Sequence, residues 1–249
     1  MILVLGLYLR LPFGKFHQGT PEVIRMANLI GRTPSAVAMR LSNYASLDPM
    51  LQARGVIGLP GGADKCRSYW EEFFNDKETL IFECAKIQSQ YEHESLESKY
   101  RDILQDIPES IVGSTREQIV KVRVNQSFFR QIVLANYDYK CALSGIDIRE
   151  LLVASHVVPW RDSVEDRLNP KNGICLSSLY DKAFDKGLIS FSEDFQVLFS
   201  SRLKKCVGKD YYSRFFEPIS GLSLPTEGIR YPVAPEFMEW HRDCIFEHI

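Results

Sequence analysis

Apolar residues recur at helical spacing through the first part of the chain. Residues 1–9 are nearly all apolar, while residues 21–30 and 34–45 place apolar side chains three and four positions apart. Gly31 suits the end of one such segment, and Thr33 suits the N-cap of the next. The pattern predicts a buried first helix, followed by two helices that a short turn connects.

Helix, glycine-containing turn and helix is the form of a helix-turn-helix unit. In that arrangement the second helix and its approach would present the DNA-facing side chains, which we place at Arg32, Ser35, Arg40 and Asn43. The same spacing also suits an αα-hairpin that packs on the rest of its domain. The spacing leaves both interpretations open.

The middle of the chain is rich in helix-forming residues. Residues 54–64 are glycine-rich but lack the Gly-Lys-Ser/Thr ending of a phosphate-binding loop, so we expect a surface loop there. Residues 70–100 have a helical composition with many glutamates, which predicts a bridging segment with a solvated acidic face. We therefore divide the chain into a helical module (1–75), a helical linker (76–112) and a second domain (113–249).

The second domain mixes strand and helix signals, which predicts an α+β fold class. Residues 119–124 look strand-like, and residues 126–136 look helical. Residues 195–200 alternate like an edge strand, and residues 235–246 have the pattern of a closing amphipathic helix.

Between these segments, one histidine, one asparagine and two carboxylates are expected near a common point. His156 ends an apolar run and is predicted at the tip of a short strand. Asn172 lies in the turn-forming string N-P-K-N-G. Residues 176–186 have a helical pattern that places Asp181 and Asp185 on one face. Such a set suits a hard divalent cation beside a proton acceptor.

Charge is distributed unevenly along the sequence. The 30 Lys and Arg nearly balance the 32 Asp and Glu, which gives a net charge of -2. Residues 1–55 hold six basic and two acidic side chains and residues 111–140 hold five and two, whereas residues 76–110 hold four and nine. Two basic stretches suit a protein that contacts DNA at two places, although chance clustering gives the same pattern. Arg130, in the second stretch, would either hold a phosphate or lie at the surface.

Length and cysteine usage further narrow the class of protein to which the chain can belong. The 249 residues are sufficient for two domains, and the six cysteines are scattered without a C-x-x-C pair. We therefore expect no structural zinc, and reduced, mostly buried thiols in a cytoplasmic protein. The apolar start is too short to span a bilayer, so we expect no membrane partner. His241 and His248 are expected at the surface or as helix caps rather than as ligands.

Four strings around the candidate site resemble the HNH nuclease motif, in the branch found in predicted restriction endonucleases. They are C-A-x-[ST]-G, [SA]-S-H-x-x-P-W, R-L-[ND]-P-x-N-G and D-x-x-F-D-[RK]-G-L-I-S-F, at residues 141–145, 154–160, 167–173 and 181–191. The resemblance implies a ββα-metal fold that clamps one metal ion. Residues 30–49 likewise resemble the N-terminal module of the same predicted endonucleases.

The resemblance assigns roles to the candidate site residues. His156 would be the general base, with a backbone carbonyl holding its far ring nitrogen; the alternative is a satisfied core histidine. Asn172 would brace the loop or help position the metal, or is simply a turn residue. Asp181 and Asp185 would bind one Mg²⁺ or Mn²⁺ per site, the alternative being a helix cap or salt bridges to neighbouring lysines.

Two positions depart from the wider HNH pattern. Ser155 stands where many ββα nucleases carry an aspartate ligand, although the restriction-like branch also has serine. Tyr180 stands where several relatives have a histidine, and a protonated tyrosine is a poor Mg²⁺ ligand. Metal affinity is then weaker, or Asp181 and Asp185 carry it alone.

These observations predict a restriction-type endonuclease that cuts double-stranded DNA by single-metal hydrolysis. One metal site per chain cuts one strand, so double-strand cleavage calls for a homodimer or for two sequential nicks. The alternative is a non-catalytic DNA-binding protein that keeps a degenerate HNH scaffold, and a plain helix-turn-helix regulator is a third. The recognition sequence and any dependence on base modification are left open.

Overall fold

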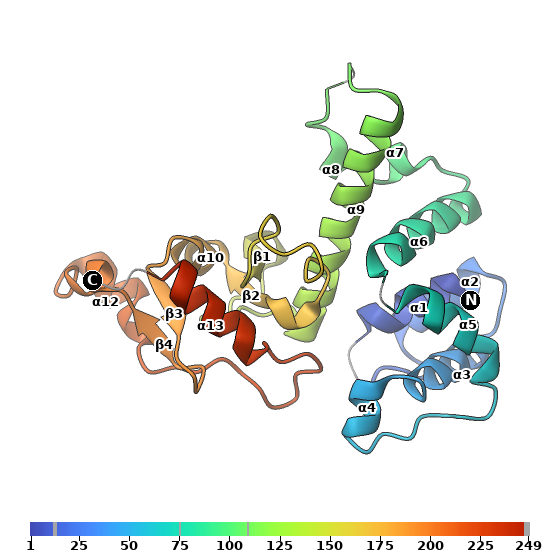
Figure 1. The fold of residues 1–249 in the computed structure, drawn as a ribbon, viewed down its shortest axis with the longest axis horizontal. Coiled ribbons are helices and arrows are strands. Elements are labelled where there is room, and N and C mark those ends of the chain that lie inside the picture. The colour runs from blue at the N-terminus through green and yellow to red at the C-terminus, as the bar shows by residue number, and fades with distance from the viewer. Residues whose placement is uncertain (12–13, 75, 109, 247–249) are drawn as a thin grey trace. The chain divides into compact units, whose positions relative to one another are not determined.

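The computed structural model describes residues 1–11, 14–74, 76–108 and 110–246 of the chain. It forms two compact units, residues 1–128 and 129–249 (Figure 1). Helix α9 (Gly113–Asn136) begins in the first unit and ends in the second. Within the described residues, no helix has the length and apolar character needed to cross a bilayer.

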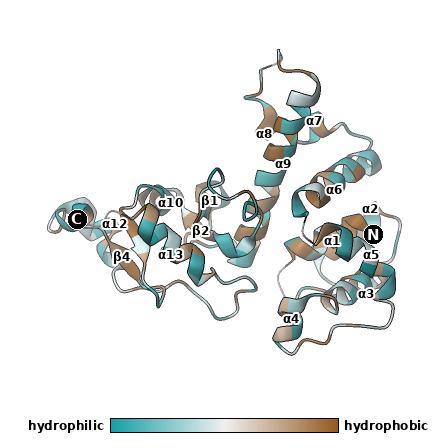
Figure 2. Cartoon of the chain, in the orientation of Figure 1, coloured by the Kyte–Doolittle hydropathy of each residue, from teal (hydrophilic) through white to brown (hydrophobic). Residues whose placement is uncertain are grey.

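The first unit is a cluster of helices around α1, which is buried as predicted. Side chains from Leu3 to Tyr8 are buried, and α1 packs against α2, α3, α5 and α6. Gly6 permits the contact with α6, because a Cβ there would lie 2.6 Å from Sγ of Cys84. Figure 2 shows α1 as a largely hydrophobic ribbon. The helices before α9 are α1 (Ile2–Arg10), α2 (Pro21–Leu29), α3 (Pro34–Ala45), α4 (Pro49–Ala53), α5 (Asp64–Phe73), α6 (Lys77–Glu92), α7 (Leu96–Lys99) and α8 (Arg101–Leu104).

The predicted pair of helices around the glycine turn is confirmed. Gly31 follows α2 with a φ of +64°, a conformation that favours glycine. Thr33 caps α3, because its Oγ1 accepts a hydrogen bond from the backbone N of Ala36 at 3.2 Å. α2 and α3 pack against each other. An αα-hairpin and a helix-turn-helix unit share this packing, so the structure leaves both interpretations open.

The segment expected to bridge the two modules, residues 76–112, lies within the first unit. α6 packs against α1 and α5, and its Leu80 belongs to the same buried core as Leu3 and Tyr44. The helical composition of this segment is as predicted, but its apolar face is used to build the core. The described acidic side chains of this segment are exposed or half-buried.

The strand predicted over residues 119–124 is wrong, because these residues continue α9. The alternating valines there also fit a strand, yet the buried side chains are Val120, Val124 and Phe128, four positions apart along one helical face. Val122, between them, is 38% exposed.

The second unit contains a ββα arrangement. β1 (Leu152–His156) pairs antiparallel with β2 (Gly173–Ser177), so His156 lies opposite Gly173. α10 (Ser178–Asp185) follows β2 directly and packs against both strands. The strand predicted to end at His156 is therefore confirmed.

Other predicted elements of this unit are confirmed with small shifts. The helix with the two aspartates begins two residues later than predicted, because Leu176 and Ser177 pair with β1. The edge strand is β4 (Val197–Phe199), which pairs with β3 (Ile189–Phe191). Two small antiparallel sheets among many helices give the predicted α+β class. The remaining elements are η1 (Arg149–Leu151), η2 (Pro170–Asn172), α11 (Ser201–Lys204), α12 (Asp210–Phe215), η3 (Glu217–Ile219) and α13 (Pro235–Cys244).

The surface position expected for His241 is wrong. α13 packs against β3, and this contact leaves His241 only 1% exposed. Its Nδ1 lies 3.0 Å from Oγ of Ser190, its Nε2 lies 3.2 Å from the carbonyl oxygen of Phe184, and its ring stacks on that of Phe184. It is thus a satisfied core histidine. His248 lies outside the described residues.

Candidate functional site

His156 is held by one stacked ring, one perpendicular ring and one hydrogen bond. The ring stacks on Phe129 of α9 with centroids 3.7 Å apart, and it meets Trp160 edge-on at 5.5 Å. Its Nε2 lies 3.0 Å from the carbonyl oxygen of Arg167. A carbonyl can only accept a hydrogen bond, so Nε2 carries the proton and Nδ1 keeps its lone pair. Among the described residues, none forms a hydrogen bond with Nδ1.

The protonation state of His156 follows from its surroundings. Burial lowers the pKa of His156 below its ordinary value, and the hydrogen bond to the Arg167 carbonyl partly opposes that shift. The imidazole is therefore neutral near pH 7. A neutral ring of fixed tautomer is the form that can accept a proton from water.

Asn172 closes the loop between β1 and β2. It is 1% exposed. Its Oδ1 accepts from the backbone N of Val158 at 2.8 Å, and its Nδ2 donates to the carbonyls of Val158 at 3.0 Å and Asp166 at 3.3 Å. The loop that it closes contains Arg167, whose carbonyl holds His156. The side-chain amide thus braces the support of the histidine.

The first string of the motif also has a structural use. Sγ of Cys141 accepts hydrogen bonds from the backbone N atoms of Ser144 at 3.4 Å and Ser177 at 3.1 Å. The thiol therefore ties a turn to the start of α10. Four of the six cysteines are buried, and all six are free thiols.

Asp181 and Asp185 lie on α10, next to the strand that carries His156. Burial raises the pKa of Asp181, the negative charge of Asp185 raises it further, and the nearby Ser155 hydroxyl opposes the rise. Burial also raises the pKa of Asp185, against the opposing charges of two lysines. Two carboxylates that disfavour each other's charge are a place where a cation is stabilising.

Ser155 supports the same interpretation. Its hydroxyl is buried and makes no well-aligned hydrogen bond with a described residue, although it lies beside Asp181. Because burial disfavours the charged forms of Asp181 and Asp185, a cation with its water shell beside these carboxylates would be stabilising. The residues thus fit a hydrated divalent ion. Within the described parts of the chain, no three His, Cys, Asp or Glu side chains form a metal-binding cluster on their own.

Tyr180 does not offer its hydroxyl to this site. It is 6% exposed, its hydroxyl donates to the carbonyl oxygen of Phe215 at 2.6 Å, and its ring meets Phe216 edge-on. Burial raises its pKa, so the hydroxyl stays protonated. Tyr180, one of the two residues that depart from the HNH pattern, attaches α12 to α10.

The Arg130 side chain donates hydrogen bonds to backbone carbonyls. Its Nη1 donates to the carbonyl of Leu152 at 2.6 Å, and its Nη2 donates to the carbonyl of Arg149 at 2.9 Å. Both atoms therefore fix the backbone where β1 begins, and the phosphate contact that the sequence offered for Arg130 stays a prediction.

The four side chains predicted to contact DNA in the first unit fall into two pairs. Arg32 and Ser35 are exposed near the start of α3. Asn43 is 1% exposed, and its Nδ2 donates to the carbonyls of Leu59 at 2.7 Å and Gly61 at 3.1 Å. It holds the glycine-rich loop, so the DNA-facing position predicted for it does not match this structure.

Arg40 also contacts the glycine-rich loop that Asn43 holds. Its Nη1 donates to Oδ1 of Asn43 at 3.2 Å and to the carbonyl of Gly62 at 3.3 Å, and the residue is half-buried. These internal hydrogen bonds use Nη1 of Arg40, and the DNA contact predicted for this residue stays a prediction. The loop carbonyls are distant in sequence, so spacing along α3 gives no sign of them.

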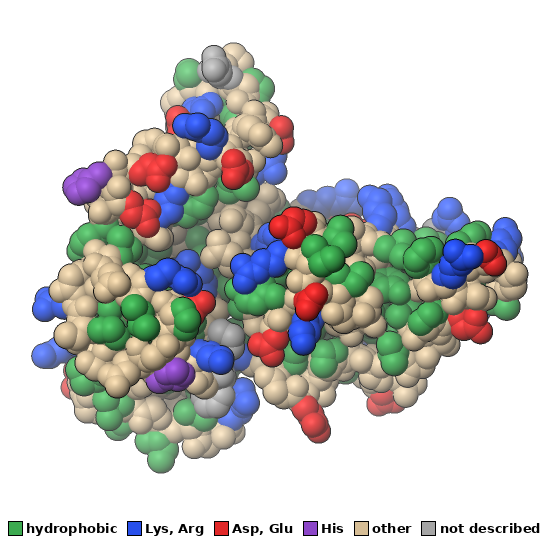
Figure 3. All heavy atoms as spheres, turned by 180° about the vertical axis from the view of Figure 1, so that it is seen from behind, with side chains coloured by type: hydrophobic (Ala, Val, Ile, Leu, Met, Phe, Trp, Pro, Cys, Tyr) green, Lys and Arg blue, Asp and Glu red, His purple; other side chains and the backbone are tan. Residues whose placement is uncertain are grey.

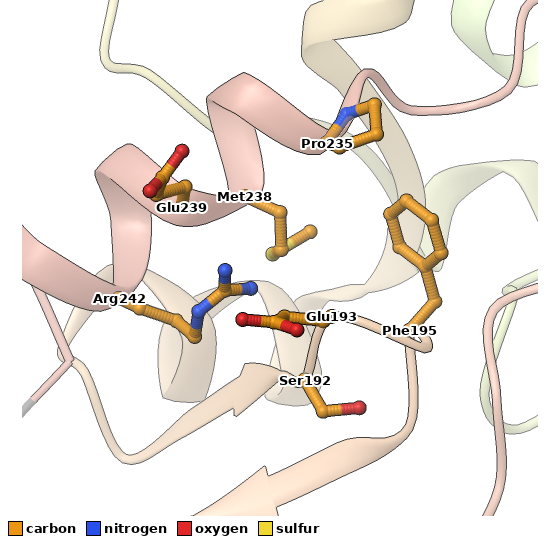
Figure 4. Close-up of a pocket in the computed structure, with 7 residues that line it drawn as sticks. All are labelled: Ser192, Glu193, Phe195, Pro235, Met238, Glu239 and Arg242. Carbon is orange, nitrogen blue, oxygen red and sulfur yellow. The ribbon is translucent and has the colours of Figure 1, made fainter.

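A separate pocket of about 290 Å³ lies between α13 and the turn after β3 (Figure 4). Met238 forms its buried floor, and Glu193 and Glu239 are exposed at its rim. Arg242 donates to the carbonyl of Phe191 at 3.0 Å. None of the predicted site residues lines this pocket.

Comparison with known families agrees with the geometry around His156. Residues 141–192 match the family model of HNH endonucleases. The matched HNH segment includes the histidine, Asn172 and both aspartates, and it supports a nuclease domain that acts on DNA. It ends before α11, α12 and α13, and it begins after Phe129. No curated protein matches the chain.

Sequence reasoning missed two contributors to the site. Phe129 was hidden in an ordinary apolar helix face, and only its stacking on His156 shows its use. A backbone carbonyl was expected on the far ring nitrogen of His156, but no side-chain pattern reveals that Arg167 supplies it.

Proposed function

We propose that this protein is a restriction-type endonuclease that hydrolyses double-stranded DNA with one Mg²⁺ or Mn²⁺ per site. The observation that carries the proposal is the hydrogen bond from Nε2 of His156 to the Arg167 carbonyl, which leaves the Nδ1 lone pair available, next in the chain to Ser155 beside Asp181. All four residues lie in the HNH segment. One strand and one helix thus supply a proton acceptor and paired carboxylates.

The chemistry of the chain's own residues follows from this arrangement. Nδ1 of His156 takes a proton from the attacking water, and the Arg167 carbonyl stabilises the imidazolium through Nε2. Asp181 and Asp185 would hold a divalent ion, which when bound would supply positive charge that stabilises the phosphate and the leaving oxygen. Asn172 keeps the loop, and so the carbonyl, in place.

DNA is the proposed partner of both units. Arg32 and Ser35 would contact DNA in the helix-turn-helix interpretation of the first unit, because they are exposed at the start of α3. Cleavage of both strands would use a homodimer. The buried, free thiols suit the cytoplasm.

A second candidate is a DNA-binding protein that has lost hydrolysis. It is favoured by Tyr180, which replaces a histidine of several relatives, and by the lack of a three-residue metal cluster among the described side chains. Both candidates bind DNA, so only cleavage separates them.

The deciding experiment is incubation of supercoiled plasmid, unmodified and cytosine-methylated, with Mg²⁺ or Mn²⁺. We expect nicked or linear products that EDTA abolishes and that His156→Ala reduces by at least about 100-fold. His17→Ala is the matched control, since His17 is exposed in the first unit. DNA binding without nicking in either metal would favour the scaffold alternative. A difference between the two plasmids would reveal dependence on base modification.

A further inference from the structure

The segment that contains α11 and α12 combines basic and aromatic side chains outside the HNH segment. Residues 201–216 hold five basic side chains and one acidic one. The lysines among them, Lys204, Lys205 and Lys209, are exposed. Figure 3 shows Lys and Arg side chains interspersed with hydrophobic ones at the end of the second unit that carries α12.

α12 and the residue that follows it carry one buried pair and one exposed pair of aromatic rings. Tyr212 and Phe216 are buried, and Tyr212 contacts Phe199 of β4. Tyr211 and Phe215, four positions apart, are 44% and 48% exposed. Tyr212 and Phe216, the inner pair, pack the helix against the domain. Packing therefore does not explain why Tyr211 and Phe215, the outer pair, are aromatic.

The outer aromatic rings lie among the basic residues. Nζ of Lys209 lies 5.9 Å from the ring centroid of Tyr211. Arg214 forms a salt bridge at 2.9 Å with Asp210, the one acidic residue of the segment. Exposed rings between cations can stack on bases while the cations contact phosphates.

The segment is also fixed to the candidate catalytic helix. The hydroxyl of Tyr180 on α10 donates to the carbonyl of Phe215, and the Tyr180 ring contacts Phe216. α10 also carries Asp181 and Asp185. A polyanion on α12 would therefore be held beside the helix that carries the proposed metal ligands.

We propose that this basic aromatic surface, formed by Lys204, Lys205, Lys209, Tyr211 and Phe215, binds the DNA substrate. The lysines contact backbone phosphates, and the two rings stack on unpaired bases of the strand next to the cut. This inference rests on the proposed nuclease function for its substrate. A second copy of the chain is a poorer occupant, because a two-fold contact of this surface with itself would bring like charges together.

The test measures DNA affinity in a His156→Ala background, which separates binding from cleavage. A labelled duplex and the matching single strand are titrated at several salt concentrations. The triple variant Lys204→Ala, Lys205→Ala, Lys209→Ala should lose at least about 10-fold in affinity for both. Its plot of log affinity against log salt should flatten by about 2 to 3 in slope.

The aromatic variant tests the stacking half of the proposal. Tyr211→Ala with Phe215→Ala should weaken single-strand binding by at least about 5-fold and duplex binding much less. Circular dichroism and the thermal unfolding midpoint check that these exposed substitutions preserve the fold. Tyr211→Phe, which keeps a ring, should bind the single strand like the parent.

The control triple Lys65→Ala, Arg67→Ala, Arg101→Ala removes the same charge from exposed positions elsewhere. Equal losses in both triples, or parent-like binding by the lysine triple, would overturn the inference. A parent protein that binds no DNA would overturn both proposals. Selective loss in the surface variants without plasmid nicking by the wild type would support the surface and reject the nuclease.

Discussion

Two histidines of the second unit have nearly the same surroundings but different capabilities. His156 and His241 each stack on a phenylalanine at a centroid distance of 3.7 Å, and each places Nε2 on a backbone carbonyl. They differ at Nδ1, which bonds to Ser190 in His241 and has no described hydrogen-bond partner in His156. A single lone pair therefore separates a structural histidine from a candidate base.

The structural role of His241 predicts a pH dependence of stability. Burial lowers its pKa to about 4, whereas the unfolded chain returns it to about 6.5. The unfolded state therefore binds a proton that the folded state does not. Above about pH 6.5 the histidine is neutral in both states and costs the folded state nothing. As pH falls from 6.5 towards 4, protonation in the unfolded state lowers the free energy of unfolding by up to about 3 kcal/mol. Urea unfolding across this range measures it.

His241→Gln should be less stable at neutral pH and should show a flatter dependence on pH over this range. The exposed His17→Gln should keep the wild-type slope. Carboxylates contribute to acid destabilisation in every variant, so the comparison between the two substitutions carries the test. Equal slopes for His241→Gln and wild type would rule out this role.

At the scale of elements, the site depends on how closely α9 approaches the two strands. A Cβ at Gly173 would lie 2.5 Å from Cγ2 of Val133 and 2.8 Å from Cζ of Phe129. Gly173 is the partner of His156 in the strand register, and Phe129 stacks on His156. The glycine in N-P-K-N-G thus allows the helix to press its phenylalanine against the histidine.

Gly173→Ala should therefore disturb stability and activity together. Displacing the helix side chains should cost about 1 to 3 kcal/mol in the free energy of unfolding and should lower the plasmid nicking rate. Denaturant unfolding and nicking assays measure the two effects. Gly61→Ala is the control, since a Cβ there meets nothing within 4 Å and its backbone is not left-handed. If Gly173→Ala keeps wild-type stability, the side chains of α9 can move away from the added Cβ without lowering the free energy of unfolding, and the prediction is wrong.

The elements were predictable where the signal is local. The cap at Thr33 and the strand ending at His156 depend on a few neighbouring residues, and both are confirmed. The valines of 119–124 fit two periods, and only the buried stripe that continues to Phe128 decides for the helix. A local hydrophobic pattern therefore predicts the type of element only when it fits the helical repeat or the strand repeat, but not both.

Side-chain partners were far less predictable. Asn43 and Arg130 carry groups suited to DNA, yet both bond backbone carbonyls, those of Leu59 and Leu152, that lie well away in sequence. Residue type and spacing do not encode such partners. In contrast, the segment with His156 and the two aspartates was found because its spacing reflects a single compact ββα arrangement.

At the scale of the whole molecule, the chain carries one candidate site, which can cut one strand at a time. Cleavage of both strands of a duplex therefore calls for two copies of the site or for two successive cuts. If a homodimer cuts both strands, linear plasmid should form with little nicked intermediate, and its rate should rise more steeply than linearly with protein concentration. Time courses at several protein concentrations, with sedimentation to establish the oligomeric state, measure this.

Subunit mixing makes the same prediction sharper. Because His156→Ala removes the proposed base but none of the proposed DNA contacts, an excess of this variant should form mixed dimers on the plasmid. Each mixed dimer has one competent site, so the product should change from linear to nicked circles. The His17→Ala protein, added in the same excess, should leave linear plasmid as the product. Independent monomers would instead give nicked circles before linear plasmid in the wild type, and the mutant would only slow both steps.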